Sequence, residues 1–337
     1  MTGAGAPGAP GIIRCLQQDE RIQLTVADAD ENATGKYLSG DFVVIPKADA
    51  EDFIPVLLKV CRERAIHVLM PLVTRELFHL AKYRNEFEQA GTKVLVSSHE
   101  AITVANDKSK CYQFLREKNI SVPKFFVVKT IEQFQLVAKQ LGWPGNEFCF
   151  KPSVSNGSRG FRIVSNKVDG FDLLFNYKPN STYIRYEDAV RILSSKTFPE
   201  LLVSEYLPGE EYSVDCLAFH GEARLILPRL RKKMVNGISV QGEFVQDEFI
   251  IEHCRRILQA LQLHGNIGIQ VKRNAAGEAL LLEINPRVQG TIVAGLGAGI
   301  NLPLLAVKQA LDLPTAQDEL QVKWGTKFSR YWTEVFY

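Results

Sequence analysis

Short β-rich runs alternate with helical stretches over the first third of the chain. A helical pattern from Ala50 to Arg64, for example, separates two of these runs. Strands and helices that alternate in this way are typical of a parallel sheet with helices on both faces. The pattern therefore predicts an N-terminal α/β domain, with strands at Ile22 to Ala27, Asp41 to Ile45, Ala65 to Leu72 and Lys93 to Ser97.

After residue 106 the pattern becomes that of an antiparallel sheet with a few helices. His220-Gly221 is typical of a tight hairpin turn, and the polar segment 169–200 is predicted to be a helical excursion. The first elements expected are a helix at 107–118, a strand at 124–128 and a helix at 130–141. The later strands expected are Glu147 to Lys151, Phe161 to Val164, Leu201 to Leu207, Glu211 to Phe219 and Glu222 to Leu230.

Composition and charge narrow the classes of protein that remain. The 337 residues are 46% hydrophobic and 23% charged, which excludes disorder and collagen-like repetition and suggests two or three domains. With 40 Lys and Arg against 38 Asp and Glu, the net charge of +2 gives no general attraction to nucleic acid or to an anionic membrane. Any polyanion must therefore be held by local groups.

No segment has the sequence of a membrane span or a secretory signal. The longest apolar runs, such as Ala65 to Val73, are much shorter than the roughly 20 residues that a spanning helix needs. Residues 1–10 are rich in Gly, Ala and Pro and lack a basic head, so a cytoplasmic location is expected. The cysteines contain no CxxC pair and are expected to be buried reduced thiols: Cys15, Cys61, Cys111, Cys149, Cys216 and Cys254.

A glycine-rich motif, Gly3-x-Gly5-x-x-Gly8, opens the chain and matches a dinucleotide-binding pattern. The motif should follow a strand, yet only two residues precede it. Either the given start lies a few residues too late, which we favour, or the sheet begins with a short strand. Asp28 and Asp30 follow the strand at 22–27, as a ribose contact would require. The same glycines equally suit a plain strand-to-helix turn, which we prefer.

The most informative segment is a predicted hairpin that ends in Glu283-x-Asn285-Pro-Arg287. Side chains alternate along a strand, so Glu283 and Asn285 share one face. If the turn centres between residues 276 and 277, Gln270 lies opposite Glu283. Amide and carboxylate oxygens together are what Mg²⁺ prefers, and Arg287 adds a planar donor for phosphate or carboxylate. The alternative is an ordinary solvated hairpin face, which for Gln270 alone is the preferred reading.

Two further segments have the residue types of a nucleotide site. Lys151 ends a strand and runs into the Gly/Ser-rich segment 153–160, which can hold phosphate oxygens through backbone N–H groups. This is not a Walker A loop, and a plain hairpin is the alternative. The apolar run that ends at Glu205 to Leu207 can frame an adenine, and Glu211 can hold a ribose, unless Glu210 and Glu211 form a solvated turn.

Taken together and in order, these motifs resemble the ATP-grasp superfamily, and within it the branch that is similar to the large subunit of carbamoyl-phosphate synthetase. The resemblance covers about residues 1–313. A glutamine at the first metal position, Gln270, where many relatives have an acid, points to this branch. The resemblance implies an α/β pre-ATP-grasp domain at 1–106, an α+β ATP-grasp domain at 107–313 with a lid at roughly 120–205, and a C-terminal tail at 314–337.

The resemblance also implies a role for each motif residue. The nucleotide ligands implied are Lys108 and Lys151 on the phosphates, Gly157 in the phosphate loop, Glu205 and Leu207 around adenine, and Glu211 on the ribose. The metal ligands implied are Gln270, Glu283 and Asn285, for two Mg²⁺ ions that Mn²⁺ can replace. Lys151 and Arg287 would be catalytic, with Arg287 at the transferring phosphoryl group.

The function implied is that of a ligase that phosphorylates a small carboxylate with ATP and passes the acyl phosphate to an amine, releasing ADP and phosphate. Only one synthetase unit is present, without a glutaminase region, so production of carbamoyl phosphate is not expected. A homodimer is possible under this reading. The alternatives are a non-catalytic ATP-binding sensor or assembly protein, and an NAD-dependent oxidoreductase that uses the glycine-rich turn.

A few residues keep two readings at this stage. Arg229, Arg231 and Lys232 can neutralise phosphates or form an exposed basic strand end. Gln289 and Thr291 are guesses for contacts with the substrate. The six histidines show no spacing typical of metal ligands or of a nucleophile and its base, so they are read as ordinary surface or core residues.

Overall fold

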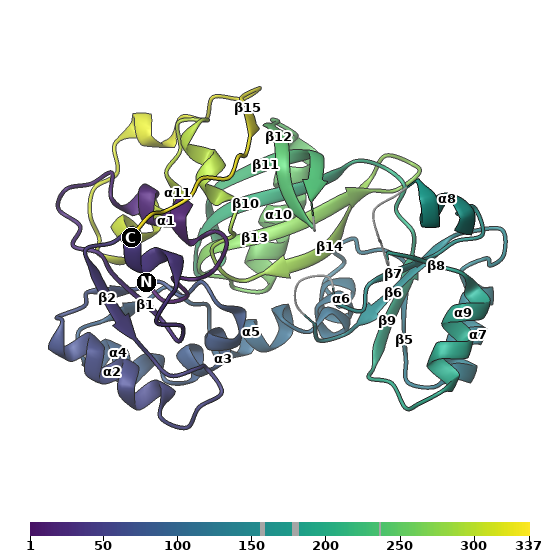
Figure 1. The fold of residues 1–337 in the computed structure, drawn as a ribbon. Coiled ribbons are helices and arrows are strands. Elements are labelled where there is room, and N and C mark those ends of the chain that lie inside the picture. The colour runs from purple at the N-terminus through teal and green to yellow at the C-terminus, as the bar shows by residue number, and fades with distance from the viewer. Residues whose placement is uncertain (156–158, 177–181, 236) are drawn as a thin grey trace. The chain divides into compact units, whose positions relative to one another are not determined.

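The structure is a computed structural model that describes residues 1–155, 159–176, 182–235 and 237–337. The chain forms two compact units, which we describe separately. The first unit comprises Met1–Ala105, Glu210–Val271 and Glu283–Tyr337, and the second comprises Asn106–Gly209 and Lys272–Leu282. Figure 1 shows the elements of both units along the chain.

The first unit opens with the expected parallel α/β arrangement. β1 pairs with β2, and β3 pairs with β4, both in parallel. Thr2 bridges Ala27 in parallel and donates its N–H to Met70 O at 3.1 Å, so the first residues fill a strand position between β1 and β3. The strands are β1 (Thr25–Asp28), β2 (Asp41–Val44), β3 (Val68–Leu69) and β4 (Lys93–Val94). The helices are α1 (Ala9–Leu16), η1 (Thr34–Tyr37), α2 (Phe53–Glu63), α3 (Thr74–Lys82), α4 (Arg84–Gln89) and α5 (His99–Ala105).

Thr2 thus makes a single parallel bridge beside β1, outside the named strands. The glycine-rich motif leads from this bridge into α1, with Gly3 at φ +73°. Gly8 lies so close to Gly290 that a Cβ on it would stand 2.2 Å from the Gly290 Cα. Gly8 therefore has a structural role in tight backbone packing. A structural role for these glycines is also the interpretation that we prefer from the sequence.

The rest of the first unit is an antiparallel sheet with the strand order β14-β13-β10-β11-β12-β15. The turn at His220-Gly221 has positive φ at both residues and closes the Phe219–Glu222 pair, as expected. The strands are β10 (Glu211–Phe219), β11 (Glu222–Val235), β12 (Ile238–Phe244), β13 (Gly265–Arg273), β14 (Ala279–Asn285) and β15 (Lys327–Ser329). The helices are α10 (Glu248–Ala260), η2 (Ile292–Leu296), α11 (Leu302–Ala310) and η3 (Gln317–Leu320).

The second unit has a small sheet with the strand order β5-β9-β6-β7-β8. Phe134, Phe148 and Val203 belong to its hydrophobic core, which is completed by side chains of α9. The helical excursion expected at 169–200 contains two helices and the short β8. The strands are β5 (Phe125–Val128), β6 (Phe148–Pro152), β7 (Arg162–Val164), β8 (Tyr183–Ile184) and β9 (Leu201–Glu205). The helices are α6 (Lys108–Glu117), α7 (Ile131–Gln140), α8 (Gly170–Phe175) and α9 (Tyr186–Ser194).

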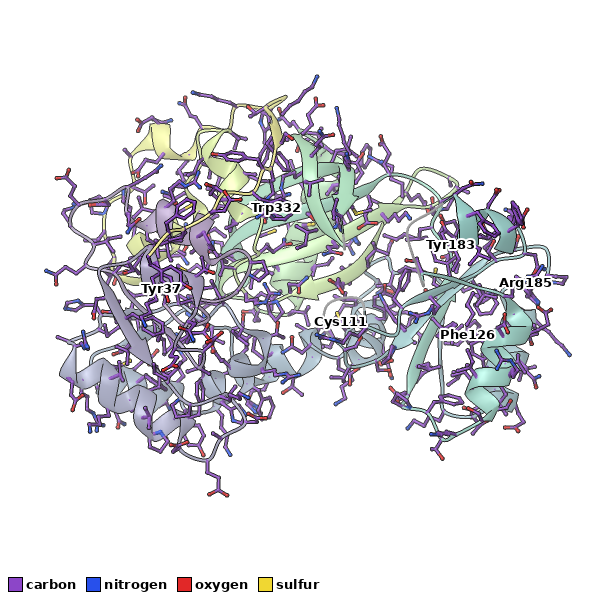
Figure 2. The ribbon with its side chains drawn as sticks, viewed as in Figure 1. Tyr37, Cys111, Phe126, Tyr183, Arg185 and Trp332 are labelled. Carbon is purple, nitrogen blue, oxygen red and sulfur yellow. The ribbon has the colours of Figure 1, made fainter. Side chains whose placement is uncertain are left out.

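Two expectations about the chain as a whole can be compared with the structure. Across the described residues, every helix is too short or too polar to cross a membrane. All six cysteines are buried free thiols, as expected, and Figure 2 labels one of them, Cys111 on α6. Burial raises the pKa of Cys111 to about 12, which keeps this thiol protonated. The domain boundaries expected from the sequence stay a prediction.

Candidate active site

Two of the predicted metal ligands lie side by side on β14. Asn285 donates its Nδ2–H to Glu283 Oε1 at 3.1 Å, so both side chains project from one face of the strand, as the alternation predicts. Gln270 lies on the neighbouring β13 and is half-buried, whereas Ile269 and Val271 on either side of it are fully buried. All three predicted ligands therefore lie on adjacent strands and supply oxygen atoms.

The turn between these two strands differs by one residue from the expected one. Gly277 donates to Asn274 O at 3.0 Å, and Asn274 donates to Glu278 O at 2.9 Å. Asn274 thus pairs with Glu278 across a three-residue turn, with Gly277 at φ +84°, instead of a turn centred between residues 276 and 277. The premise that set Gln270 directly opposite Glu283 was wrong, because it ignored the extra residue that a glycine-containing turn can absorb.

Arg287 is held in place by two hydrogen bonds. Its Nε donates to Thr74 Oγ1 at 2.9 Å and its Nη1 to Val288 O at 2.9 Å. Burial lowers the pKa of this guanidinium, and the nearby Glu283 partly restores it. Glu283 therefore lies within electrostatic reach of Arg287, so this end of β14 presents a negative charge beside a fixed positive one.

Glu211 is paired with Arg231 across β10 and β11. Arg231 donates from Nη1 to Glu211 Oε1 and from Nη2 to Gly237 O. Burial lowers the pKa of Arg231, while Glu211 and then Glu283 raise it. Arg231 thus pairs with the carboxylate predicted for the ribose, and the carboxylate predicted for the metal acts on it only electrostatically.

Arg229, two residues before Arg231 on β11, is fully buried instead of forming an exposed strand end. Its Nη2 donates to Asp215 Oδ2 at 3.0 Å and to Thr291 Oγ1 at 2.7 Å. Lys232 points to the other face of the strand and pairs with Glu243 at 2.5 Å. The three basic residues that the sequence groups together therefore have three different environments.

Lys108 begins helix α6 in the second unit and is buried. Its Nζ donates to Ser155 O at 2.8 Å, just before the glycine-rich segment. The Ser109 hydroxyl lies 2.5 Å from that of Ser153, which in turn donates to Glu200 Oε1 at 2.9 Å. These contacts fix the base of the glycine-rich segment to α6 and to the start of β9. Gly157 itself lies outside the described residues.

Lys151 on β6 donates its Nζ to Leu282 O at 2.8 Å. The same ammonium lies 5.6 Å from the centre of the Tyr112 ring, a distance typical of a cation–π contact. The Tyr112 hydroxyl also donates to Leu282 O at 3.1 Å and to Leu281 O at 2.6 Å. Lys151 is therefore oriented by one carbonyl and one aromatic ring within the second unit.

The segment predicted to frame adenine is ordered by backbone contacts. Glu205 Oε1 accepts the Lys124 N–H at 2.7 Å, and the Glu205 N–H donates to Lys124 O at 3.0 Å. Leu207 is buried, and Lys272 lies 5.1 Å from the centre of the Tyr206 ring. Leu207 thus has the apolar environment expected of an adenine slot. The Glu205 carboxylate already accepts a hydrogen bond from the backbone N–H of Lys124.

The acid that would recognise a dinucleotide ribose has a structural role here. Asp28 Oδ2 accepts the Gly5 N–H at 2.7 Å, and Asp28 Oδ1 accepts the Asp30 N–H at 3.0 Å. The carboxylate thus satisfies backbone donors of the glycine-rich turn and of the chain after β1. This use favours the structural reading of the motif over the oxidoreductase alternative.

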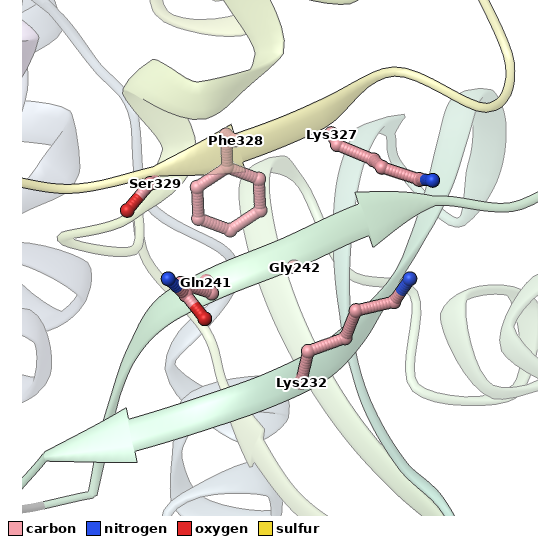
Figure 3. Close-up of a pocket in the computed structure, with 6 residues that line it drawn as sticks. All are labelled: Lys232, Gln241, Gly242, Lys327, Phe328 and Ser329. Atoms are coloured by element: carbon pink, nitrogen blue, oxygen red, sulfur yellow. The ribbon is translucent and has the colours of Figure 1, made fainter.

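A pocket of about 370 Å³ lies among β11, β12 and β15. Figure 3 shows Lys232 and Lys327 extending toward one end of it, with Gln241 and Ser329 at the other end and the Phe328 ring between them. Of the described residues that the sequence analysis considers for phosphate, nucleotide or metal binding, Lys232 lines this pocket.

Sequence reasoning missed several residues that support the site. Tyr112, Ser109, Ser153 and Thr74 are small or common polar residues whose partners are distant in sequence, so no local pattern marks them. Asp215 is different, because it lies inside the apolar run of β10 and is buried. A charged residue in such a run needs a partner, and this was the available signal.

Comparisons with known proteins identify the families and folds that this chain resembles. The family model "ATP-grasp in the biosynthetic pathway with Ter operon" matches residues 197–329, and the model "PylC-like, N-terminal domain" matches residues 10–95. The large chain of carbamoyl phosphate synthase from Thermoanaerobacter pseudethanolicus is 29% identical over 235 residues, which are 65% of this chain and 20% of that one. The chain thus spans about a fifth of the length of the curated relatives it matches first.

Solved structures share the fold at low sequence identity. The N5-carboxyaminoimidazole synthase from Aspergillus clavatus, solved with ADP and its aminoimidazole ribonucleotide, has a TM-score of 0.70 and 18% identity, over 96% of this chain and 78% of that one. The L-amino acid ligase from Bacillus licheniformis has a TM-score of 0.65 and 17% identity, over 94% and 76%. The fold class expected from the sequence is confirmed. Residues 197–329 thus match an ATP-grasp family model, and the chain is similar in sequence to the large chains of carbamoyl phosphate synthase.

Proposed function

We propose that the protein is an ATP-dependent ligase that activates a small carboxylate as an acyl phosphate for attack by an amine. The match of residues 197–329 to an ATP-grasp family model supports the use of ATP, and one of the structural neighbours is an L-amino acid ligase by its name. The observation that carries the proposal is the group Glu283, Asn285 and Arg287 at the end of β14, with Gln270 on the next strand.

The donor atoms of this group suit Mg²⁺. One carboxylate and two amide oxygens are hard ligands, and Mg²⁺ typically uses one or two carboxylates and completes its shell with water and substrate phosphates. Among the described residues, no group of three or more His, Cys, Asp or Glu side chains is arranged so that it could hold a metal ion. Mn²⁺ has similar preferences, and the number of ions, two in our proposal, follows the resemblance.

The residues proposed to bind the nucleotide follow the family resemblance. Lys108 and Lys151 would neutralise its phosphates, after exchanging or sharing their present carbonyl acceptors, Ser155 O and Leu282 O. Gly157 would contribute a backbone donor. Glu205 and Leu207 would frame adenine, and Glu211 would hold the ribose while its Oε1 remains paired with Arg231.

Phosphoryl transfer needs positioning and charge neutralisation more than a protein nucleophile. The divalent cation supplies charge for the triphosphate, and the lysines and Arg287 supply fixed donors. The Arg287 guanidinium is pre-oriented by Thr74 and by Val288 O, so little reorganisation is needed when the phosphoryl group arrives. The acyl phosphate then has a good leaving group, which an unactivated carboxylate lacks. A cytoplasmic site and a homodimer complete the proposal.

Release of ADP, screened over small carboxylates alone and paired with amines, tests this function. Glu283→Gln and Lys151→Ala should each lower turnover at least 100-fold, because each removes a charge at the phosphates or metal while the fold stays intact. Glu278→Gln, the same substitution at the exposed hairpin tip, is the matched control. Wild-type ADP release by Glu283→Gln would contradict the metal role. Binding of Mg-ATP without ADP release for every pair would support the sensor alternative.

A further inference from the structure

The segment that follows the proposed metal ligands, residues 287–291, is fastened to the first unit on several sides. Arg287 bonds Thr74 from within this segment. The Gln289 side chain lies so close to Gly268 that a Cβ on Gly268 would be 2.2 Å from it. The Gln289 Nε2 donates to Val214 O at 3.4 Å. Gly290 packs on Gly8. Gln289 and Thr291 are both buried and help to hold the segment, while a contact of either residue with substrate stays a prediction.

The contact at the end of this segment comes from the buried ion pair on β10 and β11. Arg229 Nη2 reaches both Asp215 Oδ2 and Thr291 Oγ1, and the guanidinium lies 5.3 Å from the centre of the Phe328 ring of β15. Asp215 Oδ1 and Arg229 Nη1 have no hydrogen-bond partner although both are buried. Burial raises the pKa of the Asp215 carboxyl, and Arg229 offsets this only in part.

A buried ion pair of this kind costs free energy, because both charges are removed from water. Two buried charges with incomplete hydrogen bonding are often replaced by apolar side chains of similar volume without loss of stability. Unsatisfied buried polar atoms are uncommon, and each calls for an explanation. Stability alone therefore does not account for Arg229, whereas its bond to Thr291 gives it a specific task.

We propose that Arg229, fixed by Asp215 and Phe328, is a positioning residue that holds Thr291 and thereby keeps Arg287 in register with Glu283 and Asn285. This inference rests on the proposed function for its effect on turnover. Arg229 touches no reacting atom. It acts on the reaction through four residues of backbone, so a small displacement at Thr291 would move the guanidinium of Arg287 away from the transferring phosphoryl group.

Thr291→Val and Thr291→Ser form the test. Valine has the shape of threonine but cannot accept the Arg229 bond, whereas serine keeps the hydroxyl. ADP release is measured with the best substrate pair found, or as basal Mg-ATP hydrolysis. Thr291→Val should lower kcat about tenfold or more, the usual effect of losing a hydrogen bond to a charged group, with KM for ATP unchanged, and Thr291→Ser should retain most of kcat. Equal kcat for the two variants would overturn the proposal.

Hydrogen exchange of the backbone amides of residues 287–292 gives a second readout that needs no substrate. Thr291→Val should exchange these amides faster than wild type and Thr291→Ser, while the β10 amides stay unchanged. Unchanged exchange in Thr291→Val would overturn the positioning role even if the proposed function holds. A wild-type protein that releases no ADP under any condition would overturn the proposed function and the catalytic part of this inference, while exchange still decides whether Arg229 holds the segment.

Replacing both Asp215 and Arg229 with apolar residues separates the effect of the ion pair on turnover from its effect on stability. Asp215→Leu combined with Arg229→Met should unfold at a midpoint no lower than wild type, because both desolvated charges are removed together, yet it should show the low kcat of Thr291→Val. Wild-type kcat in this double variant would contradict the proposal. A double variant that fails to fold would show that the pair is needed for stability and would count against the argument from its cost.

Discussion

At the scale of single residues, the clearest chemical anomaly outside the proposed site is Glu76 on α3. It is 5% exposed and accepts a hydrogen bond from the Thr2 hydroxyl at 2.5 Å. Burial is the largest cause that raises the pKa of the Glu76 carboxyl to about 7. The hydrogen bond from Thr2 acts in the opposite direction and lowers this pKa, whereas the nearby Asp28 raises it. The folded state thus binds this proton more tightly than the unfolded chain, whose glutamate has a pKa near 4.5.

This shift predicts a pH-dependent gain from Glu76→Gln. Because the native state holds more protons between pH 4.5 and 7, the free energy of unfolding of wild type falls as the pH rises through this window. Glutamine cannot ionise, so the variant should be more stable than wild type by about 2–3 kcal/mol at pH 8, with little difference at pH 4.5. Urea unfolding at the two pH values measures this gap.

Glu86→Gln, at an exposed position on α4, is the control and should show no such dependence. A gap between Glu76→Gln and wild type that is the same at both pH values would contradict the assignment, as would a variant that is less stable than wild type at pH 8.

At the scale of elements, α1 and the segment after β14 meet through glycines. Gly8 caps α1 and faces Gly290 with no room for a side chain, since a Cβ on Gly8 would lie 2.9 Å from the Gly290 carbonyl oxygen. Gly11, one turn further along α1, faces Val293 of η2, with a Cβ-to-carbon distance of 2.8 Å. The Gly290 atoms that a Cβ on Gly8 would meet belong to the backbone, so no change of side-chain rotamer could relieve that clash.

Gly8→Ala should therefore destabilise the first unit. The added methyl meets backbone atoms, not the end of a flexible side chain, and overpacking of this kind costs about 1–3 kcal/mol. Gly40→Ala is the control, because a Cβ at Gly40 meets nothing within 4 Å. Denaturant unfolding compares the two variants. A loss at Gly8 no larger than that at Gly40 would mean that the two segments separate at little cost.

The elements also show what the sequence could predict and what it could not. The alternation of strand-like and helix-like patterns correctly predicted parallel strand pairing in the N-terminal part of the chain. Burial gives the apolar residues of strands and helices different periods, which can be recognised in the sequence. The same pattern overestimated Ala65 to Leu72, of which only Val68–Leu69 are paired as a strand, since a buried apolar run looks the same in a loop as in a strand. The hairpin register depended on one residue in a turn, and the Arg229 contacts depended on a partner 62 residues away.

At the scale of the whole molecule, each of the two compact units contains residues to which the family resemblance gives a role. Lys108, Lys151 and Glu205 belong to the second, and Gln270 and Glu283 to the first. Even the hairpin of β13 and β14 is shared, because its tip, Lys272–Leu282, belongs to the second unit. Local sequence reasoning identified these residues one by one through the family resemblance, but the supporting contacts within each unit appear only in the fold.

The proposed function predicts how magnesium nucleotide affects thermal unfolding. A ligand that binds only the folded chain stabilises it by about 2.7 kcal/mol at a concentration 100 times its Kd, which should raise the midpoint by several degrees. If the assignments are right, Glu283→Gln in the first unit and Lys151→Ala in the second should each reduce this rise, whereas Glu278→Gln should keep it. Scanning calorimetry with ATP, with and without Mg²⁺, measures the effect. An equal rise without Mg²⁺, or an undiminished rise in Glu283→Gln, would show that the carboxylate does not hold a metal-bound nucleotide.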